Sequence, residues 1–311
     1  MNRNPLPLAL TLSLALSACS ASTDDLTEVL PDDRVLVNLD TSGADAFTAR
    51  SDVGDWSEYY LQTAESTETV NGFIGAVLDL LDTLVHLEPS DIDRRHHTAT
   101  WGPYSDTLDP VQTRLTVQYD PETDTHTWWF DQWPKGEDGS DPVVVVAGEV
   151  DPGATRTDST GRFAVDFAAL ASLDPTTDVS GLFVSEYDLA PDGVAASAAF
   201  QDWVDLDHPE EPINAGYVYA QGDDGAGSMD LAWQDDYLDD GTLDVYVLRS
   251  RWDGSGAGRG DAVLAEGGEE LLGAASECWD DAFKLVYRAT SWEGELGDAA
   301  DCVYTDATWP E

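Results

Sequence analysis

Apolar residues recur at helical spacing in one stretch of the chain, from Thr69 to Leu87. Intervals of three and four residues place them on one side of an α-helix, and Pro89 just beyond stops the pattern. We therefore predict one amphipathic helix whose apolar side packs against the body of the domain. The residues on that side are Val70, Phe73, Ile74, Val77, Leu78, Leu81, Leu84 and Val85.

After Pro89 the pattern changes to an alternation of apolar and polar residues, which is typical of half-buried strands. Leu115, Val117 and Tyr119 alternate with polar residues, and the turn residues 120–124 lead into residues 127–130. This pattern predicts a β-hairpin. Further short apolar or alternating runs follow, many separated by Asp-Gly turns, at 143–146, 163–167, 182–184, 195–203, 217–219, 229–233, 243–252, 262–264, 283–292 and 302–304.

About ten strands at regular spacing predict a mainly β protein with one large antiparallel meander. The meander would form a curved sheet, half-barrel or barrel-like structure, with the single amphipathic helix near its N-terminus; a two-sheet sandwich would satisfy the same pattern. We also expect a helical segment around Glu269–Trp279. The run 302–304 would be the final strand of the sheet.

The N-terminus has the features of an export signal. Arg3 precedes an uncharged run from Leu6 to Leu16, which is too short to span a bilayer of about 20 apolar residues. The sequence Leu16-Ser17-Ala18-Cys19 then resembles the lipobox of bacterial lipoproteins. The resemblance implies that residues 1–18 are removed and that Cys19 carries the lipid; the alternative is an ordinary cleaved signal peptide. Ser20, where an inner-membrane retention signal would place aspartate, implies an outer-membrane lipoprotein.

This resemblance implies a domain organisation and a location in the cell envelope. After the signal peptide of residues 1–18, we expect residues 19–52 to form an acidic tether rich in Ser and Thr, with a short strand at 34–39, and residues 53–311 to form one β-rich domain. The lipid on Cys19 would attach the chain to the outer membrane, facing either the periplasm or the cell surface.

The remaining cysteines support export. With Cys19 acylated, Cys278 and Cys302 form an even pair, and the sequence near them offers no four-ligand metal set. We predict a disulfide between them.

Charge narrows the range of partners. The chain has 62 acidic and 14 basic residues and a net charge of −48. Nucleic acids and anionic membrane surfaces require basic patches, so this composition disfavours both. The hydrophobic content of 42% excludes general disorder. The acidic surface is either an adaptation to saline surroundings or a means of attracting cations.

Calcium is the cofactor that these acids could hold, because it takes six to eight oxygen ligands. The candidate residues lie in acidic turns. Because no calcium loop of the EF-hand type is present, the sequence is equally consistent with a protein that has no cofactor. Aspartate is favoured in tight turns for backbone reasons as well. The candidates are Asp223, Asp224, Asp239, Asp240 and Asp244.

The sequence contains none of the common enzyme motifs for a catalytic serine, a zinc site or a phosphate loop. Three functions stay open: a structural or interaction lipoprotein of the envelope, a carrier of an apolar ligand, and an unrecognised hydrolase. A curved sheet with a helix across it resembles the half-barrel of periplasmic lipoprotein carriers in architecture. In a carrier the lining residues would be Trp128, Trp129, Phe130, Trp233 and Trp252.

Replacing the lipobox cysteine tests the anchor. Cys19→Ala should abolish acylation and move the protein from the membrane fraction to the soluble fraction, because the mature sequence offers no other apolar segment of membrane-spanning length. Fractionation followed by immunoblotting checks this. A Cys19→Ala protein that still required detergent for extraction would contradict the lipobox assignment.

Overall fold

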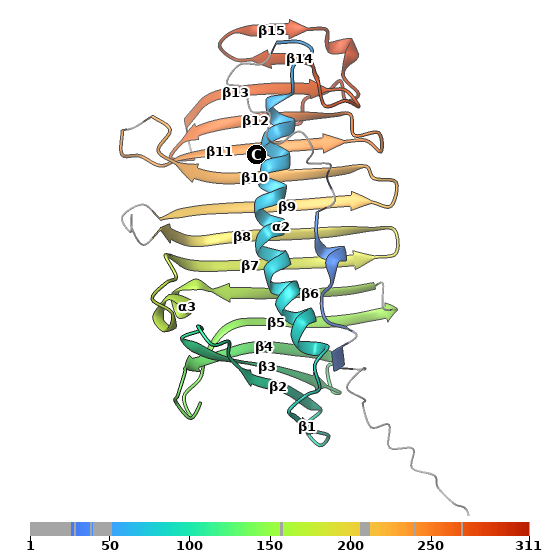
Figure 1. Ribbon diagram of the computed structural model, residues 1–311. Helices are drawn as coiled ribbons and strands as arrows, with labels where there is room; N and C mark the ends of the chain where they lie inside the picture. Colours follow the sequence, from blue (N-terminus) through green and yellow to red (C-terminus); the bar gives the residue numbers. More distant parts are fainter. Residues whose placement is uncertain are drawn as a thin grey trace, which may run out of the picture.

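The computed structural model describes residues 26–27, 29–37, 39, 52–155, 158–205, 212–238, 240–268 and 270–310. Within these residues fifteen strands form one antiparallel sheet, and each strand pairs with its neighbours in sequence (Figure 1). The predicted mainly β meander is therefore confirmed, and the sheet is open, because β1 and β15 do not pair. The strands are β1 (Asp91–Asp93), β2 (Thr98–Tyr104), β3 (Val111–Asp120), β4 (Thr125–Pro134), β5 (Val143–Thr155), β6 (Asp158–Asp166), β7 (Val179–Ala190), β8 (Gly193–Asp205), β9 (Ile213–Gly222), β10 (Gly227–Asp235), β11 (Asp244–Trp252), β12 (Gly258–Glu266), β13 (Glu270–Trp279), β14 (Leu285–Thr290) and β15 (Gly294–Gly297).

One long helix, α2 (Glu58–Val85), lies across the strands on one face of the sheet, which we call the inner face (Figure 1). The predicted apolar residues pack there, with Ile74, Leu78 and Leu81 almost fully buried. The helix begins at Glu58 rather than Thr69, because Tyr60 and Leu61 extend its buried side toward the N-terminus. A short helix, α3 (Phe167–Leu173), follows β6 at the edge of the same face.

The start of α2 is fixed to the far end of the sheet by a buried carboxylate. Ser57 caps the helix, and its hydroxyl donates to Glu277 Oε2 on β13 at 2.8 Å. The Tyr59 backbone N–H donates to the same oxygen at 3.1 Å. Burial raises the pKa of Glu277, and the nearest counter-charge, Arg288, lies 3.9 Å away. The free N–H groups at a helix N-terminus favour an acceptor at this position.

The described part of residues 26–39, which leaves out 28 and 38, runs beside α2 on the side away from α3 (Figure 1). The 3-10 helix η1 (Asp33–Val35) and the residues after it replace the short strand that we expected at 34–39. Val35 and Val37 are buried in the core, and the Asn71 side chain exchanges two hydrogen bonds with the Val37 backbone, each 2.9 Å long. These residues lie in the range of the expected tether, yet they cover one flank of the helix; Cys19 lies outside the described residues.

Large aromatic side chains on the inner face lie over glycines of the neighbouring strands. Trp128 is paired with Gly148, where a Cβ atom would come within 2.4 Å of the indole ring. Trp279 has the same relation to Gly258. The missing side chain lets the ring lie flat against the backbone of the next strand, so a wide aromatic residue fits between the sheet and the helix layer.

The C-terminal residues differ from the sequence-based predictions. Glu270–Trp279 is strand β13 and not a helix, and Cys302–Tyr304 is not a strand. The last strand is β15, which is followed by the 3-10 helix η3 (Ala299–Asp301). The disulfide between Cys278 and Cys302 is confirmed, with the two Cα atoms 5.5 Å apart.

Beyond the disulfide, the tail crosses the outer face of β11–β13. Arg259 donates to the carbonyl oxygens of Tyr304 and Thr305 at 3.3 and 3.2 Å, and Asp261 accepts from the Thr308 backbone N–H at 2.8 Å. Arg259 and Asp261 form a buried ion pair, with Nε and Oδ1 2.8 Å apart. A charged pair therefore holds an irregular segment of chain by satisfying its backbone groups.

Two glycine substitutions test the packing of Trp128 on Gly148. Gly148→Ala should lower the free energy of unfolding by roughly 1–3 kcal/mol, because the new methyl group displaces the Trp128 ring. Gly216→Ala on β9 is the matched control: its Cβ would meet nothing within 4 Å, so stability should be unchanged or rise by up to about 1 kcal/mol. Urea unfolding measures both. Equal losses in the two variants would contradict the packing of Trp128 on Gly148.

Candidate functional site

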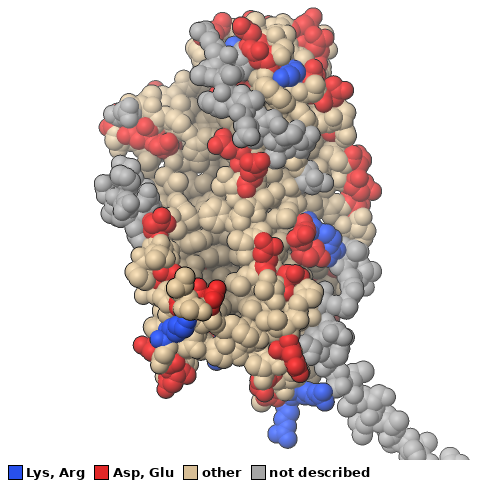
Figure 2. Space-filling model, in the orientation of Figure 1, with Lys and Arg blue, Asp and Glu red and all other residues tan. Residues whose placement is uncertain are grey.

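An open groove lies on the inner face between α2 and strands β8–β10. Figure 2 shows this face of the molecule, with acidic side chains along its margins and over its middle, and a hollowed area between them. The groove has a volume of about 400 Å³. It lies on the flank of α2 that residues 26–39 do not cover, and it exists because helix and sheet do not meet closely there.

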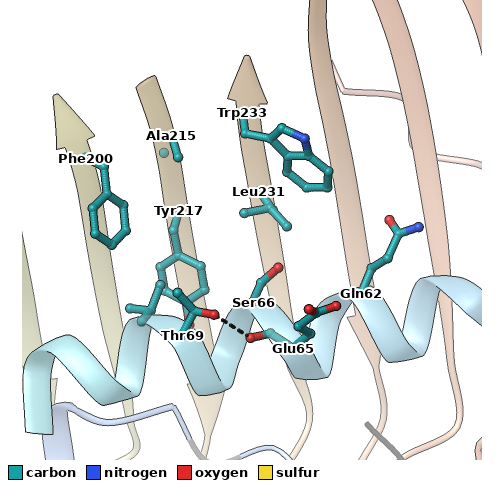
Figure 3. A pocket seen from close by; sticks show the side chains of 11 residues that line it. Gln62, Glu65, Ser66, Thr69, Phe200, Ala215, Tyr217, Leu231 and Trp233 are labelled. Carbon is teal, nitrogen blue, oxygen red and sulfur yellow. Dashed lines mark hydrogen bonds between the residues drawn. The ribbon is translucent and has the colours of Figure 1, made fainter. Parts of the chain in front are cut away.

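The two walls of the groove differ in chemistry. The sheet contributes apolar side chains from three consecutive strands, including Phe200 on β8, Tyr217 on β9 and Leu231 on β10 (Figure 3). The helix contributes mainly polar side chains at the opening. The full lining is Gln62, Glu65, Ser66, Thr69, Val70, Phe200, Ala215, Gly216, Tyr217, Leu231 and Trp233.

The Tyr217 hydroxyl is the unusual group in this lining. Its ring extends from β9 toward the helix, and the residue is only 4% exposed (Figure 3). Among the described residues its oxygen has no hydrogen-bond partner. Burial raises the pKa of Tyr217, so the hydroxyl stays protonated and can donate as well as accept. A buried hydroxyl without a partner carries a desolvation cost of about 1–3 kcal/mol.

An aromatic cluster borders the groove and makes its wall rigid. Phe200 belongs to both, and its ring centroid lies 5.0 Å from that of Phe73 on α2 and 5.3 Å from that of Trp203. Trp203 in turn lies 4.8 Å from Phe167 on α3. Rings at these distances interlock edge to face. The helix, the sheet and α3 are thereby joined at one end of the groove.

At the other end Trp233 is held by two tyrosines. Its ring lies 4.4 Å from that of Tyr246, and its indole N–H donates to the Tyr237 hydroxyl. The Tyr246 hydroxyl donates to Gln62 Oε1 on the helix at 2.7 Å. The position of Trp233 is therefore fixed before any ligand is present.

The five aromatic residues that we predicted as lining do not form one site. Trp233 lines the groove, Trp128 and Trp129 line a separate hollow on β4–β7, Trp252 lines a third hollow, and Phe130 is buried in the core. Trp129 points to the outer face, where its indole N–H donates to Asp131 Oδ2 at 3.2 Å. The alternation of residues in β4 separates neighbours of this kind onto opposite faces.

The described acidic candidates for calcium do not line the groove: Asp223, Asp224 and Asp240 lie in turns, and Asp244 begins strand β11. Asp224 and Asp240 accept hydrogen bonds from backbone N–H groups in their own turns, and Asp223 is exposed beside Asp224. Asp244 is buried and accepts from the Tyr237 backbone N–H, while Asp239 lies outside the described residues. In the part of the chain that the structure describes, no group of three or more His, Cys, Asp or Glu side chains is arranged to hold a metal ion.

The lining limits the acid–base chemistry that the groove can offer. Its lining contains no histidine, no cysteine and only one carboxylate, so it offers no acid–base pair. Sequence reasoning missed Tyr217, Phe200 and the helix residues of the lining. The alternation of apolar and polar residues placed Tyr217 in a strand. That pattern does not indicate which hydroxyl groups lack a hydrogen-bond partner in the folded protein.

Comparison with protein-family models, with curated proteins and with solved structures finds no match for the chain. Over the described residues, the structure contains no helix with both the length and the apolar character needed to cross a membrane. The function is therefore inferred from the groove itself.

Removing tyrosine hydroxyls tests whether Tyr217 lacks a partner. Tyr217→Phe should leave the free energy of unfolding unchanged or raise it by about 1 kcal/mol, because an unsatisfied group is removed. Tyr219→Phe should lower it by about 1 kcal/mol, because the Tyr219 hydroxyl donates to Gln221. Chemical denaturation of both variants gives the comparison. A loss in Tyr217→Phe as large as that in Tyr219→Phe would mean that the Tyr217 hydroxyl is already bonded.

Proposed function

We propose that the protein is a binding protein or carrier for a small apolar molecule that has at least one polar atom, and that this molecule lies in the groove between α2 and β8–β10. The two-sided lining carries the proposal, because three consecutive strands supply an apolar wall and the helix supplies polar side chains beside it. The apolar strand wall would take the body of the ligand.

The size and shape of the groove support this function. Small-molecule sites have volumes of roughly 300–1,000 Å³, and the groove falls in that range at about 400 Å³. Each buried methylene group of a ligand would contribute about 0.8 kcal/mol of binding free energy. The interlocked rings of Phe73, Phe200 and Trp203 hold the wall in place, which limits the entropy lost on binding.

This function is favoured over the other two that the sequence left open. A purely structural or interaction protein gains nothing from leaving an apolar wall of this kind uncovered beside the helix. A hydrolase needs a nucleophile and a base within hydrogen-bonding distance of each other, and the lining supplies no base other than the single carboxylate of Glu65.

We place this binding protein in the cell envelope, attached through lipid on Cys19. The lipobox-like sequence at 16–19 supports the anchor. The disulfide between Cys278 and Cys302 supports an oxidising compartment outside the cytoplasm. An anchored protein with an apolar groove would hold or transfer a poorly soluble molecule close to a membrane.

Filling the groove tests the proposed function. Ser66 lines the groove, whereas Glu68 is exposed on the same helix and does not. Ser66→Trp should weaken binding of the neutral apolar dye N-phenylnaphthylamine at least about tenfold, a loss of roughly 1.4 kcal/mol. Glu68→Trp, the matched control, should bind the dye as the unaltered protein does. Fluorescence titration measures both affinities.

Circular dichroism and thermal melting should show that both variants are folded. The proposal is wrong if the unaltered protein does not bind the dye, or if Ser66→Trp binds it as tightly as Glu68→Trp does.

A further inference from the structure

We propose that the ligand of the groove is a cationic amphiphile: an apolar body bearing an ammonium group, rather than a fatty acid or a lipid phosphate. This inference rests on the proposed function, since it concerns the same groove and its unpartnered Tyr217 hydroxyl. Beyond the proposed function, it specifies the charge of the ligand's headgroup.

The charge of the lining is the first argument. Glu65 is exposed at the helix side of the groove, and the lining includes no lysine, arginine or histidine. An anionic headgroup would enter beside a carboxylate with no counter-ion, and an unpaired charge is costly to move out of water. A cationic headgroup would meet an opposite charge instead.

The arginines on the strands already form ion pairs with acidic residues. Each lies within ion-pair distance of a carboxylate, so none is poised to turn toward the groove and neutralise an anion. The pairs on the strands are Arg114–Asp131, Arg162–Glu149, Arg249–Asp230, Arg251–Asp261, Arg259–Asp261 and Arg288–Glu277.

The second argument is the aromatic group opposite the carboxylate. Trp233 lines the groove from the strand side, while Gln62 and Glu65 line it from the helix side (Figure 3). Trp233 is fixed by Tyr246 and Tyr237, as described above. Indole rings attract cations through the negative charge of their faces, and ammonium groups are the usual ligands of such sites. The groove therefore has an indole on its strand side and a carboxylate on its helix side.

Three probes with the same eight-carbon chain and different headgroups test the inference: octylammonium, octanol and octanoate. Each is titrated against bound N-phenylnaphthylamine at an ionic strength of about 0.15 M, and the Glu68→Gln variant described below measures the contribution of the overall negative charge. Octylammonium should displace the dye at up to about fivefold lower concentration than octanol, the ratio expected for one partly exposed charge contact. Octanoate should be the weakest competitor.

A matched pair of variants locates the effect. Glu65→Gln should raise the octylammonium concentration needed for displacement to that of octanol and leave octanol itself unchanged. Glu68→Gln removes the same charge from the same helix outside the groove, and should preserve the preference.

The outcomes separate the two proposals. If octylammonium and octanol compete equally, or if Glu68→Gln abolishes the preference as Glu65→Gln does, the cationic ligand is ruled out while the apolar groove stands. If the unaltered protein does not bind the dye, the proposed function itself is wrong.

Discussion

An open sheet must bury the apolar side chains of one face, and in this protein the burial of that face against a single helix determines the rest of the structure. A helix of 28 residues is about 42 Å long. At a strand spacing of about 4.8 Å, that length covers roughly nine strands. Fifteen strands are too many for such a helix to cover in a flat sheet, so the end strands β2–β4 turn toward it and residues 26–39 cover one flank.

The groove follows from the same constraint. A helix about 10 Å across is narrower than the sheet, so it cannot cover the inner face on both of its sides. Among the described residues, the N-terminal segment fills one flank with Val35 and Val37, while the other flank receives only the aromatic cluster around Phe73 at one end. Between that cluster and Trp233 the inner face stays open. Incomplete coverage of the sheet thus places an apolar surface next to solvent, where a ligand could take the place of missing protein.

The sequence allowed the helix and the meander to be predicted because both depend on local periodicity. Ile74, Leu78 and Leu81 recur at helical spacing, and Leu115 and Val117 alternate as a strand requires. The helix predicted around Glu269–Trp279 was wrong. The stretch contains residues that favour helices, but Glu270–Trp279 pairs with β12 on one side and β14 on the other, and this pairing overrides the local preference. The fit of Trp128 on Gly148 and the unpartnered Tyr217 hydroxyl depend on which residues meet across strands, which local patterns do not record.

The hydrogen bond between Ser57 and Glu277 joins residues 220 positions apart. The helix is synthesised before the sheet that buries it, and its N-terminus acquires its partner only when β13 has formed. Contacts this distant in sequence slow folding, since the intervening chain must be ordered before they form. Nearly the whole polypeptide must therefore emerge before the N-terminal turn of the helix is enclosed. In a chain that folds in this order, the N-terminal turn of the helix keeps its polar groups open to solvent until the sheet is almost complete.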